Sequence, residues 1–250
     1  MVHIVGAGSG AVDLITVRGK NLIEMADVII YAGSLINKEL LKFAKKDCLL
    51  LDSAYMHLDE VIEQMKIAES QGKNTVRLHT GDPCVYGAIK EQMAELDRCN
   101  IEYTYTPGVS SFCGAASALK VEYTVPSVAQ TVIITRISGR TPVPEKESIP
   151  MLASHQATMV IFLSTGHLSR LSKELIEGGY SASTPAAIVY KATWDDEKIV
   201  RTTVDRLYED AQENGITKTA LIVVGNCLGD EYELSKLYDR HFTTEFRQGE

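Results

Sequence analysis

The stretch from Val76 to Ala88 contains the residues whose types and spacing are best suited to bind a small molecule. Residues 75–78 include β-branched and apolar side chains, which are typical of a short buried strand. Gly81 permits a tight turn after that strand, and Asp82 and Pro83 are favoured at the cap and the first position of a helix. A helix that begins here directs its free N–H groups above the sheet, where α/β proteins bind small molecules. The same residues also fit a strand, a turn and a helix joined for structural reasons alone.

A second glycine-rich turn follows the first predicted strand, Val2–Val5. The sequence of residues 6–11 matches the G-x-G-x-x-A form of the dinucleotide-binding fingerprint. A Rossmann fold also needs an acidic residue near the end of the second strand, where it binds the ribose. The predicted second strand, Val28–Tyr31, is followed by Ala-Gly-Ser at 32–34 and has no acid there. The fingerprint therefore lacks the context that dinucleotide binding requires.

The composition is that of an ordinary globular protein, with 45% hydrophobic and 23% charged residues. A length of 250 residues is enough for one large domain or two modest ones. The net charge of −8 argues against nucleic acid as a partner, because the phosphate backbone needs a basic surface. An anionic substrate would therefore have to be bound by a local group of basic residues.

The cysteine pattern indicates a reducing compartment. The chain has five cysteines, an odd number with no C-x-x-C pair, at positions 48, 84, 99, 113 and 227. No signal-peptide pattern and no apolar run of membrane-spanning length is present, so we expect reduced thiols, a cytoplasmic location and no membrane partner. No group of residues has the spacing of a metal site.

Predicted strands and helices alternate along the chain, which favours an α/β fold. In the first half, Thr16 can cap a short helix, and the expected strands are 2–5, 28–31, 48–51, 75–78 and 103–105, with helices between them. In the second half, the expected strands are 131–136, 159–163, 186–190, 199–204 and 220–224, with a helix that ends before Gly178. We therefore predict two α/β domains, residues 1–120 with a mostly parallel sheet and residues 121–250 with a mixed sheet.

Several of these motifs resemble those of the tetrapyrrole methylases, which use S-adenosylmethionine to methylate porphyrin-derived rings. Thr80–Pro83, with Tyr86–Ala88 behind it, is similar to the signature of this family. Further matching stretches, in the family's order along nearly the whole chain, are 13–16, 106–111, 162–164 and 190–193. The resemblance implies a cleft between the two domains, where cofactor and tetrapyrrole meet.

Within this family, three stretches are most similar to the members that methylate C-11 of a corrin precursor. They are Ala54–Leu58, Gln130–Arg136 together with Gly139–Pro142, and Trp194–Thr203. The chain departs from the family at Ser9 and Val12, where proline is usual, and both changes should loosen the glycine-rich turn.

The resemblance also implies the residues that bind S-adenosylmethionine, carried over position by position. They are Ser9, Gly81, Asp82, Val85, Ser110, Ser111, Leu163 and Ala192. N–H groups at helix starts near positions 82 and 110 would suit the methionine carboxylate and the ribose hydroxyls. The apolar side chains at 163 and 192 would suit adenine. Alternatively, Leu163 belongs to the core and Ser110 is a simple helix cap.

The expected substrate carries acetate and propionate groups, which guanidinium groups bind well. The basic residues expected at strand ends and loops of the second half are Arg136, Arg140, Lys191 and Arg201. Each could equally be a solvated surface charge. No catalytic base is evident, and His57 and His79 are candidates only because imidazole titrates near neutral pH.

Three other functions remain open from the sequence. The first is another methylase of the same fold, acting on a different ring carbon or on a protein side chain. The second is a nicotinamide-dependent oxidoreductase, inferred from the glycine-rich turn, and the third is a ligand-binding protein without catalysis. The family resemblance implies a homodimer. It leaves open whether the ring already contains cobalt.

Overall fold

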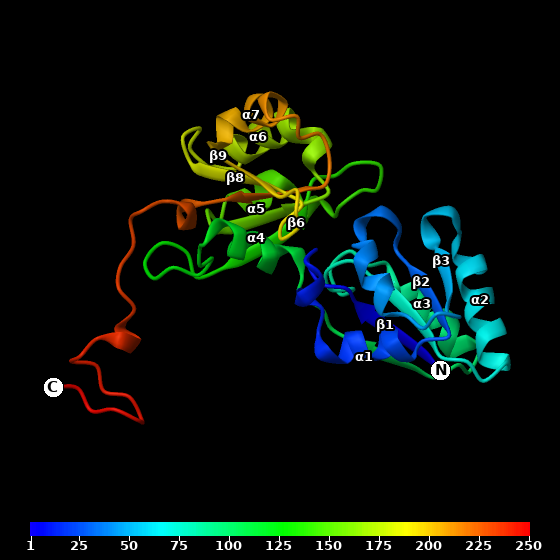
Figure 1. The fold of residues 1–250 in the computed structure, drawn as a ribbon. Coiled ribbons are helices and arrows are strands. Elements are labelled where there is room, and N and C mark those ends of the chain that lie inside the picture. Colours follow the sequence, from blue (N-terminus) through cyan, green and yellow to red (C-terminus); the bar gives the residue numbers. More distant parts are fainter. The chain divides into compact units, whose positions relative to one another are not determined.

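The chain forms two compact units, seen in a computed structural model that describes residues 1–250 except for the side chain of Ser34 (Figure 1). The first unit comprises Met1–Gly114 and Ala192–Asp196, and the second comprises Ala115–Lys191 and Glu197–Glu250. These units differ from the predicted 1–120 and 121–250, because the first ends earlier and includes a short segment from the second half. Among the described residues, no helix is long and apolar enough to cross a membrane.

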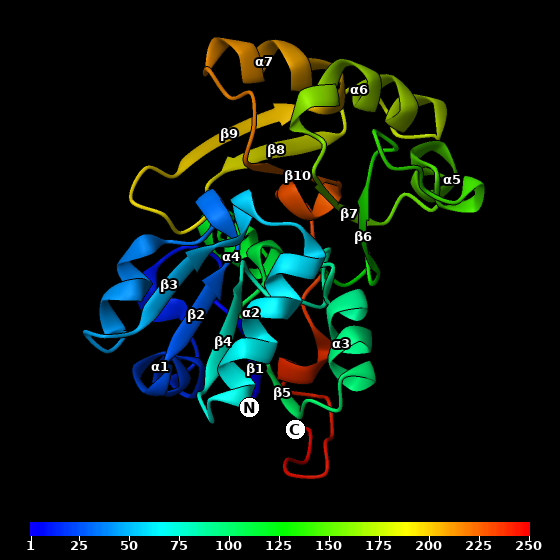
Figure 2. The same ribbon diagram turned by 90° about the vertical axis from the view of Figure 1, so that its right-hand side faces the viewer.

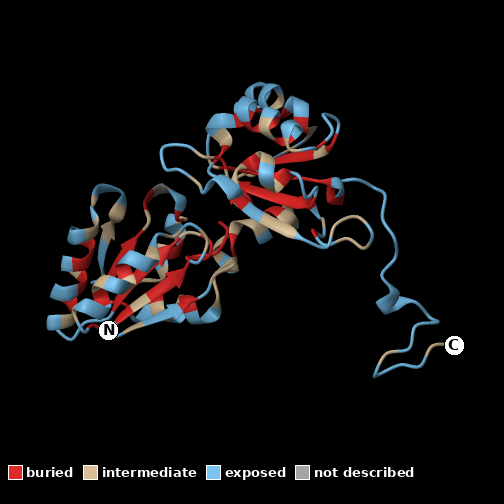
Figure 3. Ribbon diagram, turned by 180° about the vertical axis from the view of Figure 1, so that it is seen from behind, coloured by how far each residue is buried: buried red, intermediate tan, exposed pale blue. Residues whose placement is uncertain are grey.

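The first unit contains a five-stranded sheet in the order β3-β2-β4-β1-β5, and every pairing is parallel. The strands are β1 (Val2–Gly6), β2 (Val28–Tyr31), β3 (Leu49–Asp52), β4 (Thr75–His79) and β5 (Tyr103–Thr106). The central strands β1, β2 and β4 are almost entirely buried, as expected for a parallel sheet covered on both faces (Figure 3). The predicted parallel sheet is therefore confirmed.

Helices cover both faces of this sheet (Figure 2). On one face, α1 (Val17–Met25) and the 3-10 helix at 38–43 pack against the sheet. Thr16 caps α1 as predicted, with its side chain accepting a hydrogen bond of 3.1 Å from the Gly19 N–H. On the other face lie α2 (Leu58–Ser70) and α3 (Ile89–Arg98).

The helix that was predicted to begin at Pro83 begins at Ile89 instead. Residues 83–86 form turns, and both Tyr86 and Ala88 have positive φ, 56° and 49°. A right-handed helix cannot continue through left-handed residues, so the turn must end before α3 begins. Asp82 therefore caps a turn and not a helix.

Strands β1 and β4 are neighbours, but the chain leaves them toward opposite faces of the sheet. After β1 it turns to the face of α1, and after β4 it turns to the face of α3. Such a point leaves a crevice outside the carboxyl ends of the strands, and open α/β sheets bind ligands there. The fold therefore singles out the turns that follow β1 and β4.

The second unit contains a mixed five-stranded sheet in the order β6-β7-β10-β8-β9. Its strands are β6 (Val132–Arg136), β7 (Thr158–Phe162), β8 (Pro185–Tyr190), β9 (Lys198–Thr203) and β10 (Ala220–Val224). Only β6 and β7 pair in parallel, which confirms the predicted mixed sheet. The accompanying helices are α5 (Ile149–Ala153), α6 (Leu168–Glu177) and α7 (Leu207–Glu213), of which only α6 was predicted.

Candidate cofactor site

The turns that follow β1 and β4 are hydrogen-bonded to each other through their backbones. The Gly81 N–H donates to the Gly8 carbonyl over 2.9 Å, and the Gly8 N–H donates to the Gly81 carbonyl over 3.2 Å. Gly81 has a φ of +56°, which residues with a side chain adopt only with strain. The two glycine-rich motifs of the sequence therefore form one structure at the carboxyl edge of the sheet.

The turn after β5 joins this structure at Gly108. A Cβ atom at position 108 would lie 2.2 Å from the Gly81 carbonyl oxygen, so only glycine allows the two backbones to approach this closely. Three turns, from β1, β4 and β5, thus meet with little between them except backbone. The three turns are therefore held together at the carboxyl edge of the sheet, where open α/β sheets bind ligands.

The carboxylate of Asp82 connects two of these turns. It accepts hydrogen bonds from the Cys84 N–H over 2.8 Å and the Gly108 N–H over 2.9 Å, and a further one from the Tyr105 hydroxyl. Burial alone would raise the pKa of this carboxyl, but the hydrogen bonds outweigh it and hold the pKa below its ordinary value. Asp82 is therefore an anion whose first role is to fix the backbone around it.

The glycine-rich turn after β1 is closed by a segment from the second half of the sequence. The Ser9 hydroxyl lies 3.0 Å from the Thr193 hydroxyl, which also accepts a 3.0 Å hydrogen bond from the Ala11 N–H. Beside it, the Trp194 indole contacts Gly10, and Ala192 is 5% exposed. The turn was expected to be loosened by Ser9, but here Ser9 gains a partner that proline could not have.

The remaining predicted cofactor residues of the first unit lie in the same turns. Ser110 is buried directly before α4 (Ser111–Leu119), and its carbonyl accepts from the Cys113 N–H over 3.0 Å. Val85 is half-buried in the turn after Asp82. These residues therefore occur within the connected turns around Gly81.

Leu163 belongs to the second unit, where it follows β7. Its side chain is 67% exposed and its φ is +52°. A large apolar residue held exposed in this unfavourable conformation is not part of the core, so that alternative is wrong. An exposed apolar side chain of this kind is what an aromatic ligand could cover.

The two candidate histidines have opposite surroundings. His57 is exposed at the start of α2, where its backbone N–H donates 2.9 Å to Glu60 in a capping box. His79 is 4% exposed at the end of β4, and its Nε2 has no hydrogen-bond partner among the described residues. Burial, with the nearby charge of Arg77, lowers the pKa of His79 to about 3. At neutral pH His79 is uncharged and a weak base.

The basic residues of the second unit differ in how far they are free to bind a substrate. Arg136 donates to the Thr141 and Pro142 carbonyls over 3.0 and 2.8 Å, so it stiffens its own loop. Arg201 donates to the Leu119 carbonyl over 2.8 Å. Lys191 lies over the Tyr190 ring, with 5.3 Å between its nitrogen and the ring centre. Arg140 is exposed, and its side chain has no hydrogen-bond or ion-pair partner among the described residues.

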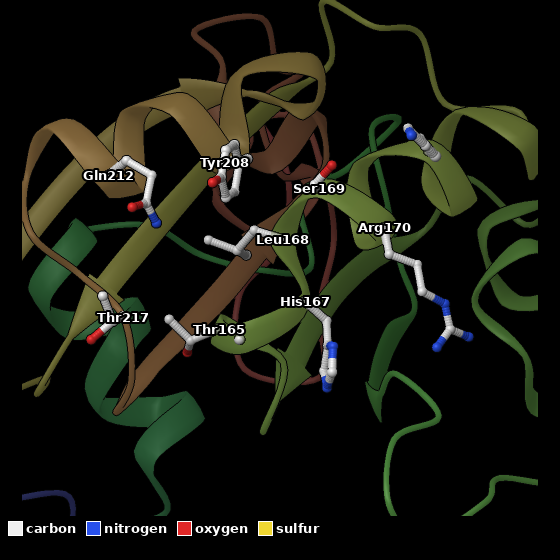
Figure 4. A pocket seen from close by; sticks show the side chains of 10 residues that line it. Thr165, His167, Leu168, Ser169, Arg170, Tyr208, Gln212 and Thr217 are labelled. Carbon is white, nitrogen blue, oxygen red and sulfur yellow. The ribbon is translucent and has the colours of Figure 1, made fainter.

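The structure has surface hollows that were not predicted, and none of the predicted cofactor residues lines the two described next. One, of about 560 Å³, lies at the start of α6 and is lined by Thr165, His167, Arg170 and Tyr208, among others (Figure 4). The other, of about 810 Å³, lies in the first unit beside the glycine-rich turn. The candidate cofactor site is therefore the set of turns at the carboxyl edge of the first sheet, which contains the predicted residues of the first unit.

Sequence reasoning missed two residues of this region. Tyr105 was interpreted only as part of a strand, although a tyrosine at the end of an edge strand can reach the neighbouring turn. Thr193 was quoted within a family motif without a role. Its link to Ser9 joins positions 184 residues apart, which no local pattern could indicate.

The fold is that of an α/β protein whose connected turns lie at the switch point of a parallel sheet, where proteins of this class bind ligands. The chain belongs to the Tetrapyrrole (Corrin/Porphyrin) Methylases, since the sequence profile of this family matches residues 1–208. It is therefore a methyltransferase.

Individual relatives match almost the whole chain. The cobalt-precorrin-4 C(11)-methyltransferase of Methanocaldococcus jannaschii is 56% identical over 248 residues, which are 99% of this chain and 96% of that protein. The solved structure of a cobalt precorrin-4 methyltransferase has a TM-score of 0.90 at 47% identity, over 92% of this chain and 96% of that one. The uroporphyrin-III C-methyltransferase of Thermus thermophilus, solved with S-adenosylhomocysteine, shares the fold, with a TM-score of 0.74 at 23% identity over 91% and 93%.

Proposed function

We propose that this protein transfers a methyl group from S-adenosylmethionine to C-11 of cobalt-precorrin-4, or of its metal-free counterpart, during cobalamin synthesis. The observation that carries the proposal is the similarity to the Methanocaldococcus enzyme, which extends along nearly the whole chain. The three stretches that resemble C-11 methylases, at 54–58, 130–136 with 139–142, and 194–203, support the same ring position. The Methanocaldococcus relative and the solved structure at 47% identity are both cobalt-precorrin-4 methyltransferases, which favours the cobalt-containing ring.

The turns around Gly81 fit S-adenosylmethionine. Their backbones approach closely at Gly81 and Gly108, so no side chain fills the space between the turns at these two positions. We assign cofactor contacts there to Ser9, Gly81, Asp82, Val85, Ser110, Ser111 and Ala192. In the second unit, Leu163 is the apolar side chain available for adenine.

S-adenosylmethionine, when bound, supplies a methyl group on a sulfonium, which is a good leaving group. The chain then needs to hold the ring carbon and the methyl in line, and the fixed backbone of the turns is suited to this task. His79 cannot serve as an effective general base at neutral pH, because its pKa is about 3. The ring proton would leave to water, to a group on the substrate or to the exposed imidazole of His57.

The acidic side chains of the tetrapyrrole need basic partners. We assign Arg140 as a direct partner, because its side chain has no hydrogen-bond or ion-pair partner among the described residues, whereas Arg136 and Arg201 donate to backbone carbonyls. Lys191 is assigned as a second basic partner on the family resemblance. Arg136 would contribute by stiffening the loop that carries Arg140. A homodimer in the cytoplasm is the assembly that the family resemblance implies, and light scattering of the purified protein tests the dimer.

Calorimetric titration with S-adenosylhomocysteine and, separately, with NAD tests the cofactor. The proposal predicts binding of S-adenosylhomocysteine and none of NAD, because no acidic residue follows β2 at positions 32–34. Binding of NAD without binding of S-adenosylhomocysteine would refute it.

A further inference from the structure

Tyr105 lies near the carboxyl end of the edge strand β5 and is 39% exposed. Its hydroxyl donates a hydrogen bond to Oδ1 of Asp82. Burial, together with the negative charge of Asp82, raises the pKa of Tyr105, so the hydroxyl keeps its proton at any physiological pH. The bond from tyrosine to carboxylate is therefore permanently charge-assisted.

The Cys84 N–H is shared between this pair. It lies 2.8 Å from Oδ1 of Asp82 and 3.1 Å from the Tyr105 hydroxyl oxygen. The Gly108 N–H donates a hydrogen bond of 2.9 Å to the other carboxylate oxygen, Oδ2. Asp82 thus holds the turn after β4 to the turn after β5, and Tyr105 holds Asp82.

The lone pairs of the carboxylate show why Tyr105 matters. Oδ1 accepts from the Tyr105 hydroxyl and the Cys84 N–H, and Oδ2 accepts from the Gly108 N–H. Without the tyrosine hydroxyl, the carboxylate would keep only donors of the turns themselves, from Gly108 and from the N–H and thiol of Cys84, so it could rotate more freely. Rotation would disturb the Gly108 bond and with it the close approach of Gly108 to Gly81.

We propose that Tyr105 is a positioning residue for cofactor binding, acting through Asp82 to hold the turns after β4 and β5 in the geometry that binds S-adenosylmethionine. Tyr105 need not touch the cofactor for this role. The inference rests on the proposed function, because it assigns the cofactor to these turns.

The same strand provides a matched control. The Tyr103 hydroxyl donates 3.3 Å to Oδ2 of Asp97, so it makes the same kind of bond. Tyr103 pairs with Val2 at the amino end of the sheet, away from the turns. A change of Tyr103 to Phe therefore removes a tyrosine–carboxylate bond from β5 without reaching the proposed site.

The test compares Tyr105→Phe, Tyr103→Phe, Asp82→Asn and the double variant Tyr105→Phe/Asp82→Asn. S-adenosylhomocysteine affinity is measured by calorimetry, and KM for S-adenosylmethionine and kcat are measured with saturating tetrapyrrole. We expect Tyr105→Phe to weaken affinity and raise KM about tenfold, the effect of one charge-assisted hydrogen bond, with kcat within about twofold of the parent. Tyr103→Phe should change neither. The double variant should be no weaker than Asp82→Asn alone, because both act through one bond.

The inference is overturned if Tyr105→Phe binds S-adenosylhomocysteine as tightly as the parent does. It is also overturned if Tyr103→Phe loses as much affinity as Tyr105→Phe does. In both cases the proposed function stands. Failure of the parent itself to bind S-adenosylhomocysteine refutes the proposed function and not this link alone. If circular dichroism shows that Tyr105→Phe does not fold, the Asp82→Asn variant is used to test the inference instead. An S-adenosylhomocysteine affinity equal to that of the parent in this variant also overturns the inference.

Discussion

Ser9 and Thr193 are 184 residues apart in the sequence, yet their hydroxyl oxygens lie 3.0 Å apart. The Thr193 hydroxyl also accepts from the Ala11 N–H, so one side chain holds the glycine-rich turn at two points. The family resemblance leads us to expect proline at position 9, which would stiffen the turn by fixing φ. This chain stiffens the same turn with a hydrogen bond from a distant segment.

Replacing Thr193 with Val should therefore weaken cofactor binding. Valine keeps the shape of the side chain but removes both hydrogen bonds, which are each worth about 0.5–1.5 kcal/mol. We expect S-adenosylhomocysteine affinity to fall roughly fivefold or more in calorimetry. Thr193→Ser, which keeps the hydroxyl, should retain nearly the parent affinity. Equal affinity in the Val and Ser variants would contradict this role for Thr193.

Leu163 should contribute to cofactor affinity and not to stability. Its side chain is 67% exposed, so truncation to Ala removes little buried surface from the protein alone. If a ligand covers it, the lost burial is worth roughly 1.5–3 kcal/mol, or about tenfold or more in affinity. Leu163→Ala should thus bind S-adenosylhomocysteine more weakly with an unchanged thermal midpoint. Leu234→Ala, at a leucine that is 83% exposed, is the control and should change neither quantity.

The stability of the protein should fall as the pH is lowered from about 6.5 toward 3. The pKa of His79 is lowered from 6.5 to about 3 in the folded protein, so in this range the unfolded chain binds a proton that the folded protein excludes. One such proton lowers the free energy of unfolding by about 1.4 kcal/mol per pH unit. Urea unfolding at pH 7, 6, 5 and 4 measures this slope.

His79→Phe should flatten that dependence, since it removes the buried imidazole. The matched control is His57→Gln, which removes an exposed imidazole and should keep the slope of the parent. If His79→Phe shows the same slope as the parent, His79 is not the group responsible.

Arg140 and Arg136 should affect the enzyme in different ways. Arg140 is exposed and has no partner in the described part of the chain. Arg140→Ala should therefore raise KM for the tetrapyrrole about tenfold, as expected for a partly desolvated carboxylate partner, and leave stability unchanged. Arg136 donates to two loop carbonyls, so Arg136→Ala should also lower the thermal midpoint. Added salt should weaken substrate binding in the parent more than in Arg140→Ala. Arg98→Ala, which alters an exposed ion pair on α3, is the control for surface charge.

The sheets could be predicted from the sequence because each strand carries its own apolar pattern between turn residues. The predicted Val28–Tyr31 strand and the cap at Thr16 agree with the structure. The predicted start of α3 at Pro83 was wrong, because the Asp82-Pro83 pair fits both the first turn of a helix and the isolated turn that forms here. Only the left-handed conformations of Tyr86 and Ala88 decide between the two, and neither residue type favours positive φ.

The glycines of the candidate site could be predicted from the sequence, but the hydrogen bonds that join its turns could not. Gly81 and Asp82 stand out in the sequence because few residue types suit such a turn. The partners Tyr105 and Thr193 come from other strands and segments, and a hydrogen bond between distant residues leaves no periodic signal. Likewise, the burial of His79 and the carbonyl contacts of Arg136 follow from packing and cannot be read from residue type.

Methyl transfer to C-11 is the central claim, and the position of the transferred methyl tests it most directly. The protein is incubated with S-adenosylmethionine labelled with ¹³C in the methyl group, and with cobalt-precorrin-4 or metal-free precorrin-4 in separate reactions. NMR of the isolated products then locates the label. The account predicts a labelled methyl on C-11 of at least one of the two rings. A label on another ring carbon, or no transfer to either ring, would contradict it.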